Sequence, residues 1–132
     1  MASKVLFTGK THTTGGSNGA AKSSDGFIDF TLPEAHPAAE NLFGVAWSAC
    51  FMGALGVAAQ QRKISLPQTP SVDAQIDLSH AGVANFFLSA RLDVSVPGVD
   101  RATAQELVEA AHEICPYSKA TRGNVEVEIN LI

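Results

Sequence analysis

Residues 42–59 form an apolar run in which Ser48 is the one polar side chain. Such a run is nearly long enough to cross a membrane as a helix. It is rich in Ala and Gly, however, which contribute little free energy of transfer, and the rest of the chain carries patterns that need a water-facing side. The run therefore predicts one long helix over residues 37–62, buried in a soluble fold or in a dimer interface, and no membrane span.

Short segments of alternating apolar and polar residues surround this helix, and a period of two is typical of strands with one wet face. The clearest pair is joined by a turn at His80-Ala81-Gly82, which predicts a hairpin. A glycine-rich turn over residues 14–19 indicates that the N-terminal region is also rich in strands. Strands are predicted over residues 4–13, 28–32, 72–78, 86–96 and 125–131.

A second helix is predicted after the hairpin. Asp100 is placed to cap its N-terminus, and apolar residues from Ala104 to Cys115 recur at helical spacing. Pro116 disfavours helical geometry at the residue before it, so a break is expected at Cys115. The order of the elements predicts an α+β fold: strands come first, then the long helix, the hairpin, the second helix and a final strand. We expect an antiparallel sheet with helices on one side, in a single domain over residues 1–132.

Composition narrows the class of protein. The 132 residues, 45% of them apolar, suit one domain with one core. The net charge is −4 and the basic residues are scattered, which argues against a nucleic-acid binder, because phosphate contacts need clustered Lys and Arg. The N-terminus has no apolar segment of signal-peptide length. We therefore expect a cytoplasmic protein whose two cysteines are either inert core residues or redox-active thiols.

The two cysteines lie in different settings. Cys50 is inside the long apolar helix, and Cys115 is at the predicted helix break before Pro116. Their spacing resembles no Cys-x-x-Cys motif, and both residues also suit the role of small buried hydrophobes. A cysteine at a break can expose its sulfur, however, and one on a core-facing helix can approach it. Two sulfurs brought together in this way could form one reversible disulfide.

Two longer motifs contain these cysteines. Residues 40–55 read ENLFGVAWSACFMGAL and resemble the first cysteine motif of the Ohr/OsmC family. Residues 111–125 read AHEICPYSKATRGNV and resemble the second. Tyr117 and the run Ala-Thr-Arg-Gly-Asn that follows it are similar to the Ohr branch, the organic hydroperoxide resistance proteins. The similarity extends over nearly the whole chain, including the turn at residues 23–26.

This resemblance implies a thiol-dependent peroxidase that reduces organic hydroperoxides to alcohols and works as an intertwined homodimer. Cys50 matches the peroxidatic cysteine, and Cys115 matches the resolving cysteine that closes a disulfide with it. A dithiol, in this family a lipoylated protein, then restores both thiols. No metal or bound organic cofactor is implied. The apolar surroundings of Cys50 favour organic substrates over hydrogen peroxide.

A buried thiol in the middle of a helix needs a cation nearby, because burial disfavours the thiolate that attacks peroxide. The family supplies an arginine from the glycine turn, paired with the glutamate that Glu40 matches. In this chain Ser17 stands where that arginine is expected, and the loop before Glu40 is short. Lys22, which flanks the same turn, is the first substitute to consider. Lys10 and Arg122 follow, and each of the three also suits a solvated surface charge.

Glu40 precedes Cys50 by ten residues, about 15 Å of axial rise in a helix. The two side chains cannot touch within one unbroken helix. If Glu40 serves the Cys50 site, it comes from a second chain or the helix is broken. The alternative is that Glu40 is only a favourable charge in the first turn of the helix.

Other candidates have simpler explanations. His112 lies one turn before Cys115, but an ordinary, partly exposed histidine suits this position equally well. A zinc site built from Cys50, Cys115, His112 and His36 is conceivable, although no pair of them has standard ligand spacing.

Aromatic residues flank the candidate site. Trp47 and Phe51 lie one turn apart beside Cys50, and core packing is their expected role. Phe86 and Phe87 point to opposite faces of a strand, so that one should be in the core and the other on a substrate or dimer surface. Two other functions stay open: a dimer with weak peroxidase activity that binds an apolar ligand through the same pocket, and a redox sensor.

Overall fold

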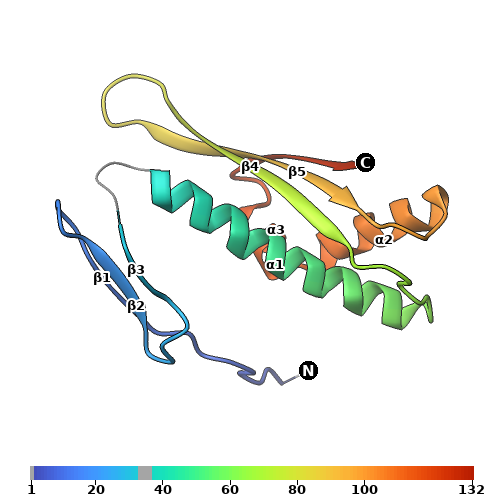
Figure 1. The fold of residues 1–132 in the computed structure, drawn as a ribbon. Coiled ribbons are helices and arrows are strands. Elements are labelled where there is room, and N and C mark those ends of the chain that lie inside the picture. Colours follow the sequence, from blue (N-terminus) through green and yellow to red (C-terminus); the bar gives the residue numbers. More distant parts are fainter. Residues whose placement is uncertain (1, 33–36) are drawn as a thin grey trace. The chain divides into compact units, whose positions relative to one another are not determined.

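A computed structural model of the chain describes residues 2–32 and 37–132. The chain forms two compact units, one that ends at Ala39 and one that begins at Glu40 (Figure 1). The predicted loop between Pro33 and Pro37 falls largely outside the described residues, as does His36.

The N-terminal unit holds a three-stranded antiparallel sheet in the order β1-β2-β3. Its strands are β1 Thr11–Thr14, β2 Ala20–Ser23 and β3 Asp29–Thr31. The strand predicted over residues 4–13 is therefore correct only from Thr11 on, because residues 4–10 have no regular structure. β2 was not predicted, since Ala-Ala-Lys-Ser has no period of two. The turn before it places Gly16 at φ +85°, which glycine adopts without strain.

The long helix α1 covers Pro37–Gln61, which confirms the helix predicted from the apolar run. It starts at a proline, whose missing N–H is harmless at the first helical position. It ends with a Schellman motif, in which Ile64 N–H donates to the Ala59 carbonyl at 2.9 Å and Lys63 N–H donates to the Gln60 carbonyl at 3.1 Å. Lys63 takes the left-handed conformation, φ +55°, at that end.

The second unit holds a sheet in the order β4-β5-β6, with β4 Ser71–His80, β5 Phe86–Ser95 and β6 Glu126–Leu131. β4 and β5 form the predicted antiparallel hairpin, in which Leu78 lies opposite Leu88. β6 pairs with β5 in parallel, from Ser89 opposite Glu126 to Val94 opposite Leu131. The expected all-antiparallel sheet was therefore wrong for this strand.

The physical reason lies in the connection between β5 and β6. The chain leaves the end of β5, passes through two helices over residues 96–125 and returns to the beginning of that strand, so that β6 must run in the same direction. The α+β class itself is confirmed.

Helix α2 covers Arg101–Ile114, and Asp100 caps it as predicted, with Oδ2 accepting from Thr103 N–H at 3.0 Å. The helix breaks at Cys115, where ψ is 119°. A short helix, α3 Pro116–Thr121, follows at once. It was not predicted, because six mostly polar residues carry no apolar stripe.

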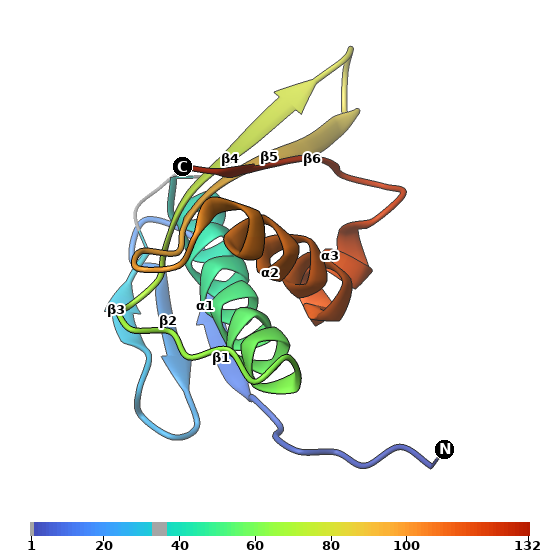
Figure 2. The ribbon, with the colours of Figure 1, turned by 90° about the vertical axis from the view of Figure 1, so that its right-hand side faces the viewer.

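The helices of the second unit lie on one side of its sheet (Figure 2). The core between them is formed by the inward side chains of α1, α2 and β5, with Phe51, Leu92 and Leu107 fully buried. Within the described residues, α1 is the one helix long and apolar enough to cross a membrane, and 39% of its most apolar window is buried. The core helix of a soluble protein also meets these criteria of length and composition, and α1 contributes Trp47, Phe51 and Leu55 to the core.

α1 buries only part of its surface within the chain. The side away from the core exposes Val45 by 69%, together with Leu42 and Val57. At about 100° per residue the three lie within roughly 120° of one another around the helix, so they form a broad apolar stripe on one side of it. Soluble monomers rarely leave such an apolar face uncovered.

Candidate active site

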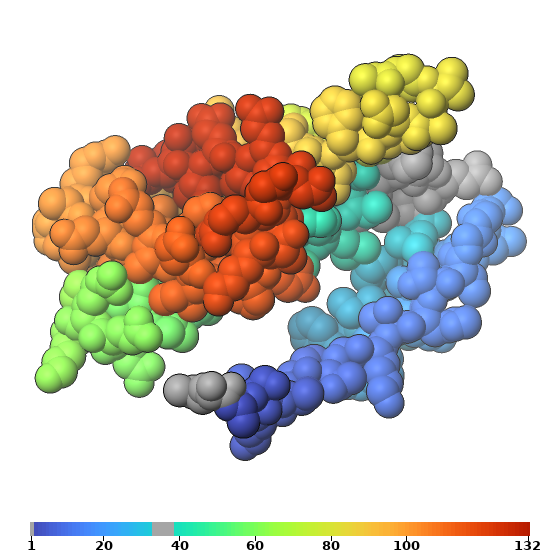
Figure 3. Space-filling model, turned by 180° about the vertical axis from the view of Figure 1, so that it is seen from behind, coloured from blue at the N-terminus to red at the C-terminus, as the bar shows by residue number. Residues whose placement is uncertain are grey.

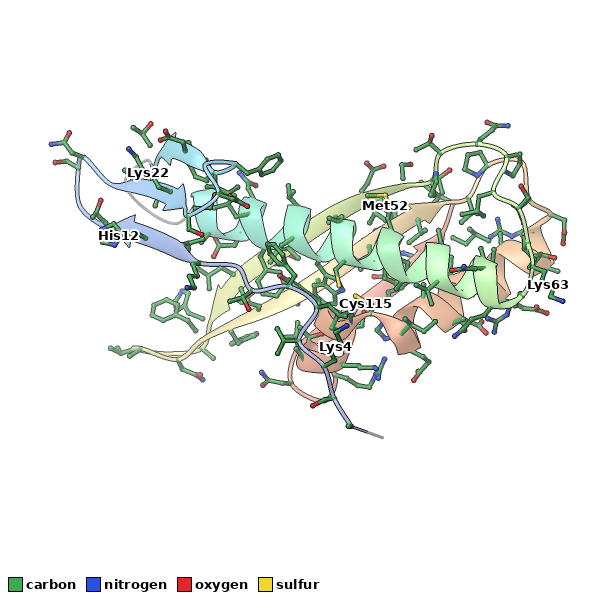
Figure 4. All side chains as sticks on the ribbon, turned by 90° about the horizontal axis from the view of Figure 1, so that it is seen from below. Lys4, His12, Lys22, Met52, Lys63 and Cys115 are labelled. Atoms are coloured by element: carbon green, nitrogen blue, oxygen red, sulfur yellow. The ribbon has the colours of Figure 1, made fainter. Side chains whose placement is uncertain are left out.

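Cys50 and Cys115 are in contact, with their sulfur atoms 3.3 Å apart. Both are free thiols. Cys115 is fully buried, whereas Cys50 on α1 is half-buried. Figure 4 shows Cys115 on one side of α1 and Met52 on the other. Two thiols at this separation can close a disulfide with a small displacement, since the bond itself is about 2.05 Å long.

Cys115 lies at the break between α2 and α3, and this break places its sulfur beside that of Cys50. Pro116 has no N–H to offer the carbonyl of His112, one turn earlier. The Arg122 guanidinium donates to that carbonyl instead, at 2.8 Å, and its Nη2 also lies 3.7 Å from Glu113 Oε1. The Cys115 N–H still closes α2 by donating to the Ala111 carbonyl at 2.8 Å. The chain therefore turns at the cysteine while its backbone stays hydrogen-bonded.

A second contact fastens α3 to α1. Trp47 Nε1 donates to Ser118 Oγ at 3.2 Å, and both residues are buried to 0% exposure. The space-filling view shows the orange-red atoms of α3 and the turn after it against the teal atoms of α1 (Figure 3). Ser118 was not singled out from the sequence. The signal available was the proline after Cys115, which starts a new helix whose third residue, Ser118, is buried.

Burial raises the pKa of the Cys50 thiol above its ordinary value. The backbone N–H of Tyr117, in the first turn of α3, lowers this pKa by hydrogen bonding to the sulfur, and Cys115 raises it again. Among the residues that the structure describes, no cationic side chain contributes to the shift. Tyr117 was predicted only as a mark of the Ohr branch, and its backbone role was missed.

The three substitute cations have other surroundings. Arg122 is held by the His112 carbonyl and Glu113. Lys22 lies 4.0 Å from Asp29 within the N-terminal unit, where both side chains are largely exposed. Lys10 and Ser17 are exposed in the same unit.

Glu40 lies away from Cys50 on the same helix. α1 is continuous from Pro37 to Gln61, so the broken-helix alternative does not hold. Glu40 lines a groove of about 540 Å³ between α1 and β4, together with Val45 and Met52, and neither cysteine lines it. Within one chain, Glu40 is therefore not part of the site around the two sulfurs.

An apolar hollow of about 410 Å³ lies beside Tyr117. Its walls come from α1, β5, α3 and the turn before β6. They are formed by Phe43, Leu88, Tyr117, Ala120, Thr121, Asn124 and Val125. This volume lies in the range of small-molecule sites.

His112 is half-buried, and its Nδ1 atom is buried with no hydrogen-bond partner in the described part of the chain. Burial lowers the pKa of His112, and the Arg122 charge lowers it further. Across residues 2–32 and 37–132, no group of three or more His, Cys, Asp or Glu side chains is arranged to hold a metal ion.

The aromatic predictions had mixed outcomes. Trp47 and Phe51 are fully buried core residues, as expected. Phe86 and Phe87 are both exposed, so the prediction that one of them is in the core was wrong. They lie at the tip of the hairpin, beyond the reach of the helices that cover the rest of β5.

Comparisons with known proteins agree on one group of relatives. The family model described as OsmC-like protein matches residues 32–130. An organic hydroperoxide resistance protein of Xanthomonas axonopodis pv. citri is 38% identical, over 97% of this chain and 96% of that one. The organic hydroperoxide resistance protein OhrB of Bacillus subtilis is 40% identical, over 96% and 98%.

Solved structures give the same result. The crystal structure of OhrB from Bacillus subtilis has a TM-score of 0.83 at 40% identity, and it covers 97% of this chain and 100% of that one. An organic hydroperoxide resistance protein from Elizabethkingia anophelis has a TM-score of 0.86 at 36% identity, covering 98% of each chain.

Proposed function

This chain belongs to the OsmC-like protein family, and from that premise we propose that it is a thiol-dependent peroxidase for organic hydroperoxides. Several relatives that share nearly its whole length are named for organic hydroperoxide resistance. The observation that carries the proposal is the contact between the two cysteine sulfurs at 3.3 Å.

The reaction has three balanced steps. The Cys50 thiolate attacks the distal oxygen of the hydroperoxide, so that the O–O bond breaks and an alkoxide leaves, to be protonated to the alcohol. The resulting Cys50 sulfenic acid condenses with the Cys115 thiol, which forms the disulfide and releases water. A dithiol reductant, which we expect to be a lipoylated protein, then gives two electrons and two protons and is itself oxidised to a disulfide.

Three features of the site support these roles. The contact between the sulfurs suits closure of the disulfide without rearrangement of α1. The Tyr117 N–H offsets part of the burial that opposes the Cys50 thiolate. The apolar hollow beside Tyr117 is not lined by either cysteine, but it could hold the organic group of a substrate, and hydrogen peroxide has no such group to place there.

A homodimer completes this proposal. The unbroken α1 keeps Glu40 away from Cys50 of the same chain, so a catalytic Glu40 must be contributed by the partner. The exposed apolar stripe on α1 is a surface that a second copy can cover. We further propose that the whole chain is one OsmC-type domain and that it works in the cytoplasm, where dithiols keep both cysteines reduced.

The test counts free thiols after the reduced protein is mixed with cumene hydroperoxide or with hydrogen peroxide. We expect rapid loss of both thiols with the organic peroxide and much slower loss with hydrogen peroxide. Cys50→Ser should abolish peroxide consumption. Cys115→Ser should permit one oxidation of Cys50 and then progress to sulfinic acid, which mass spectrometry detects.

Two outcomes would contradict the proposal. Thiols that survive excess cumene hydroperoxide would remove the peroxidase and favour a dimer that binds an apolar ligand. Undiminished peroxide consumption by Cys50→Ser, with loss of activity in Cys115→Ser, would reverse the two roles.

A further inference from the structure

A buried hydrogen bond lies one helical turn from each cysteine. Trp47, the donor, precedes Cys50 by three residues on α1. Ser118, the acceptor, follows Cys115 by three residues across the helix break. The bond therefore connects the same two segments that carry the sulfur atoms, at equal offsets along the chain.

This bond differs in kind from the packing around it. The core contacts of Trp47, such as the tilted ring of Phe43 at 5.6 Å between centroids, are apolar and tolerate small sliding movements. A hydrogen bond is directional, and both partners here are removed from water, so that breaking it leaves a buried donor and a buried acceptor unpaired. Sliding or rotation of α3 against α1 is therefore opposed at this point.

The hydrogen bond of Ser118 also restricts the position of Cys115, because only two residues separate them in the chain. Cys115 is the residue before Pro116, and α3 begins directly after it, so that the position of Ser118 determines where the Cys115 sulfur lies. The rate and equilibrium of a reaction between two held groups depend steeply on how well their geometry is fixed.

We propose that the Trp47–Ser118 hydrogen bond is a positioning contact for disulfide closure, and that it keeps the Cys115 sulfur within reach of Cys50. Its physiological meaning rests on the proposed peroxidase function. Closure itself needs no peroxide, however: with glutathione disulfide as oxidant, the two protein thiols become one disulfide and two glutathione thiols are formed.

The experiment equilibrates the protein in glutathione redox buffers and measures the disulfide fraction by acid quenching, alkylation and mass spectrometry. Trp47→Phe removes the N–H and keeps an aromatic ring, and Ser118→Ala removes the acceptor. We expect each variant to lower the equilibrium constant for closure roughly tenfold, by analogy with the loss of one buried hydrogen bond. The double variant should be no worse than either single one, because both changes remove the same bond.

A matched control separates positioning from general stability. Asp100→Ala removes the cap at the far end of α2 and should destabilise the fold to urea by a similar amount. It should leave the closure constant unchanged, since the cap does not contact either cysteine segment.

Three results would overturn the proposal: unchanged closure in Trp47→Phe and Ser118→Ala, equal loss of closure in Asp100→Ala, or losses that multiply in the double variant. Failure of the peroxidase is distinguishable from these. A wild-type protein that closes its disulfide with glutathione disulfide but ignores cumene hydroperoxide would remove the proposed function and leave the positioning contact in place.

Discussion

Cys50 is held in an environment that opposes its own ionisation. Burial raises its pKa, the Tyr117 N–H only partly offsets this, and the neighbouring sulfur of Cys115 raises it again. Peroxide reacts with the thiolate, so the raised pKa of Cys50 lowers the share of the protein that is in the reactive form at neutral pH. The residue expected to correct this in the family, an arginine, is replaced by Ser17.

The pH dependence of oxidation follows from this shift. Because the pKa of Cys50 is raised, the thiolate fraction grows with each step in pH, and the rate of oxidation by cumene hydroperoxide should climb steadily between about pH 7 and pH 9. Stopped-flow mixing that follows the fluorescence of Trp47, which lies beside Cys50, measures this rate. A rate already constant above about pH 7 would contradict the prediction and would indicate a cation near the sulfur in the assembled protein.

Ser17→Arg tests the missing cation directly. If the family arrangement holds, the guanidinium lowers the pKa of Cys50 by about one unit, and oxidation at pH 7 becomes about tenfold faster. The gain should shrink as the pH rises, because the wild-type thiol ionises too. Ser17→Gln provides a side chain of substantial length without charge, and equal rates in the two variants would exclude an electrostatic effect.

At the scale of elements, the junction of α2 and α3 is the feature that produces the site. A continuous helix would carry residues 116–121 onward along the axis of α2. Pro116 prevents this and leaves the His112 carbonyl without its usual donor, and Arg122 supplies one. Arg122 therefore has a structural explanation that does not require it to serve Cys50.

We expect Arg122→Ala to lower the free energy of unfolding in urea by about 1 kcal/mol, because the His112 carbonyl loses its hydrogen bond. Glu113→Gln should change it by less than about 0.5 kcal/mol, since the ion pair is exposed. In a Pro116→Ala background the residue at 116 has an N–H that can donate to the His112 carbonyl. Arg122→Ala should then lower the free energy of unfolding by less than it does in the wild type. Equal costs in both backgrounds would contradict the compensation.

At the scale of the molecule, α1 is apolar on a side that its own chain does not cover. The stripe that includes Leu42, Val45 and Val57 continues along the helix past the level of Cys50. A second copy of the chain would bury this surface and could bring its own Glu40 to the site. The dimer and the catalytic use of Glu40 are thus two parts of one prediction.

Val45→Glu tests the dimer, since a carboxylate buried in an apolar interface without a partner is strongly unfavourable. We expect the wild type to sediment at twice the mass of the chain. The dissociation constant of the Val45→Glu dimer should be at least about tenfold higher than that of the wild type. Val83→Glu, at a turn residue that is 100% exposed, is the matched control and should remain dimeric. A monomeric wild type, or dissociation of both variants alike, would count against α1 as the interface.

Features that depend on neighbours along the chain could be predicted from the order of the residues. The long helix, the β4–β5 hairpin, the Asp100 cap and the break before Pro116 were all predicted, because each follows from the spacing or the backbone restrictions of adjacent residues. Two local features escaped prediction: the strand β2, whose four residues carry no pattern, and the short helix α3, whose six residues carry no apolar stripe.

Contacts between distant segments could not be predicted in this way and were found in the folded chain. The parallel pairing of β6, the contact between the Cys50 and Cys115 sulfurs and the hydrogen bond from Trp47 to Ser118 connect residues 37 to 71 positions apart. The raised pKa of Cys50 belongs to this group as well, because burial is a property of the packed core. No spacing along the chain encodes these relations, since they arise from the way in which the helices and strands fit together.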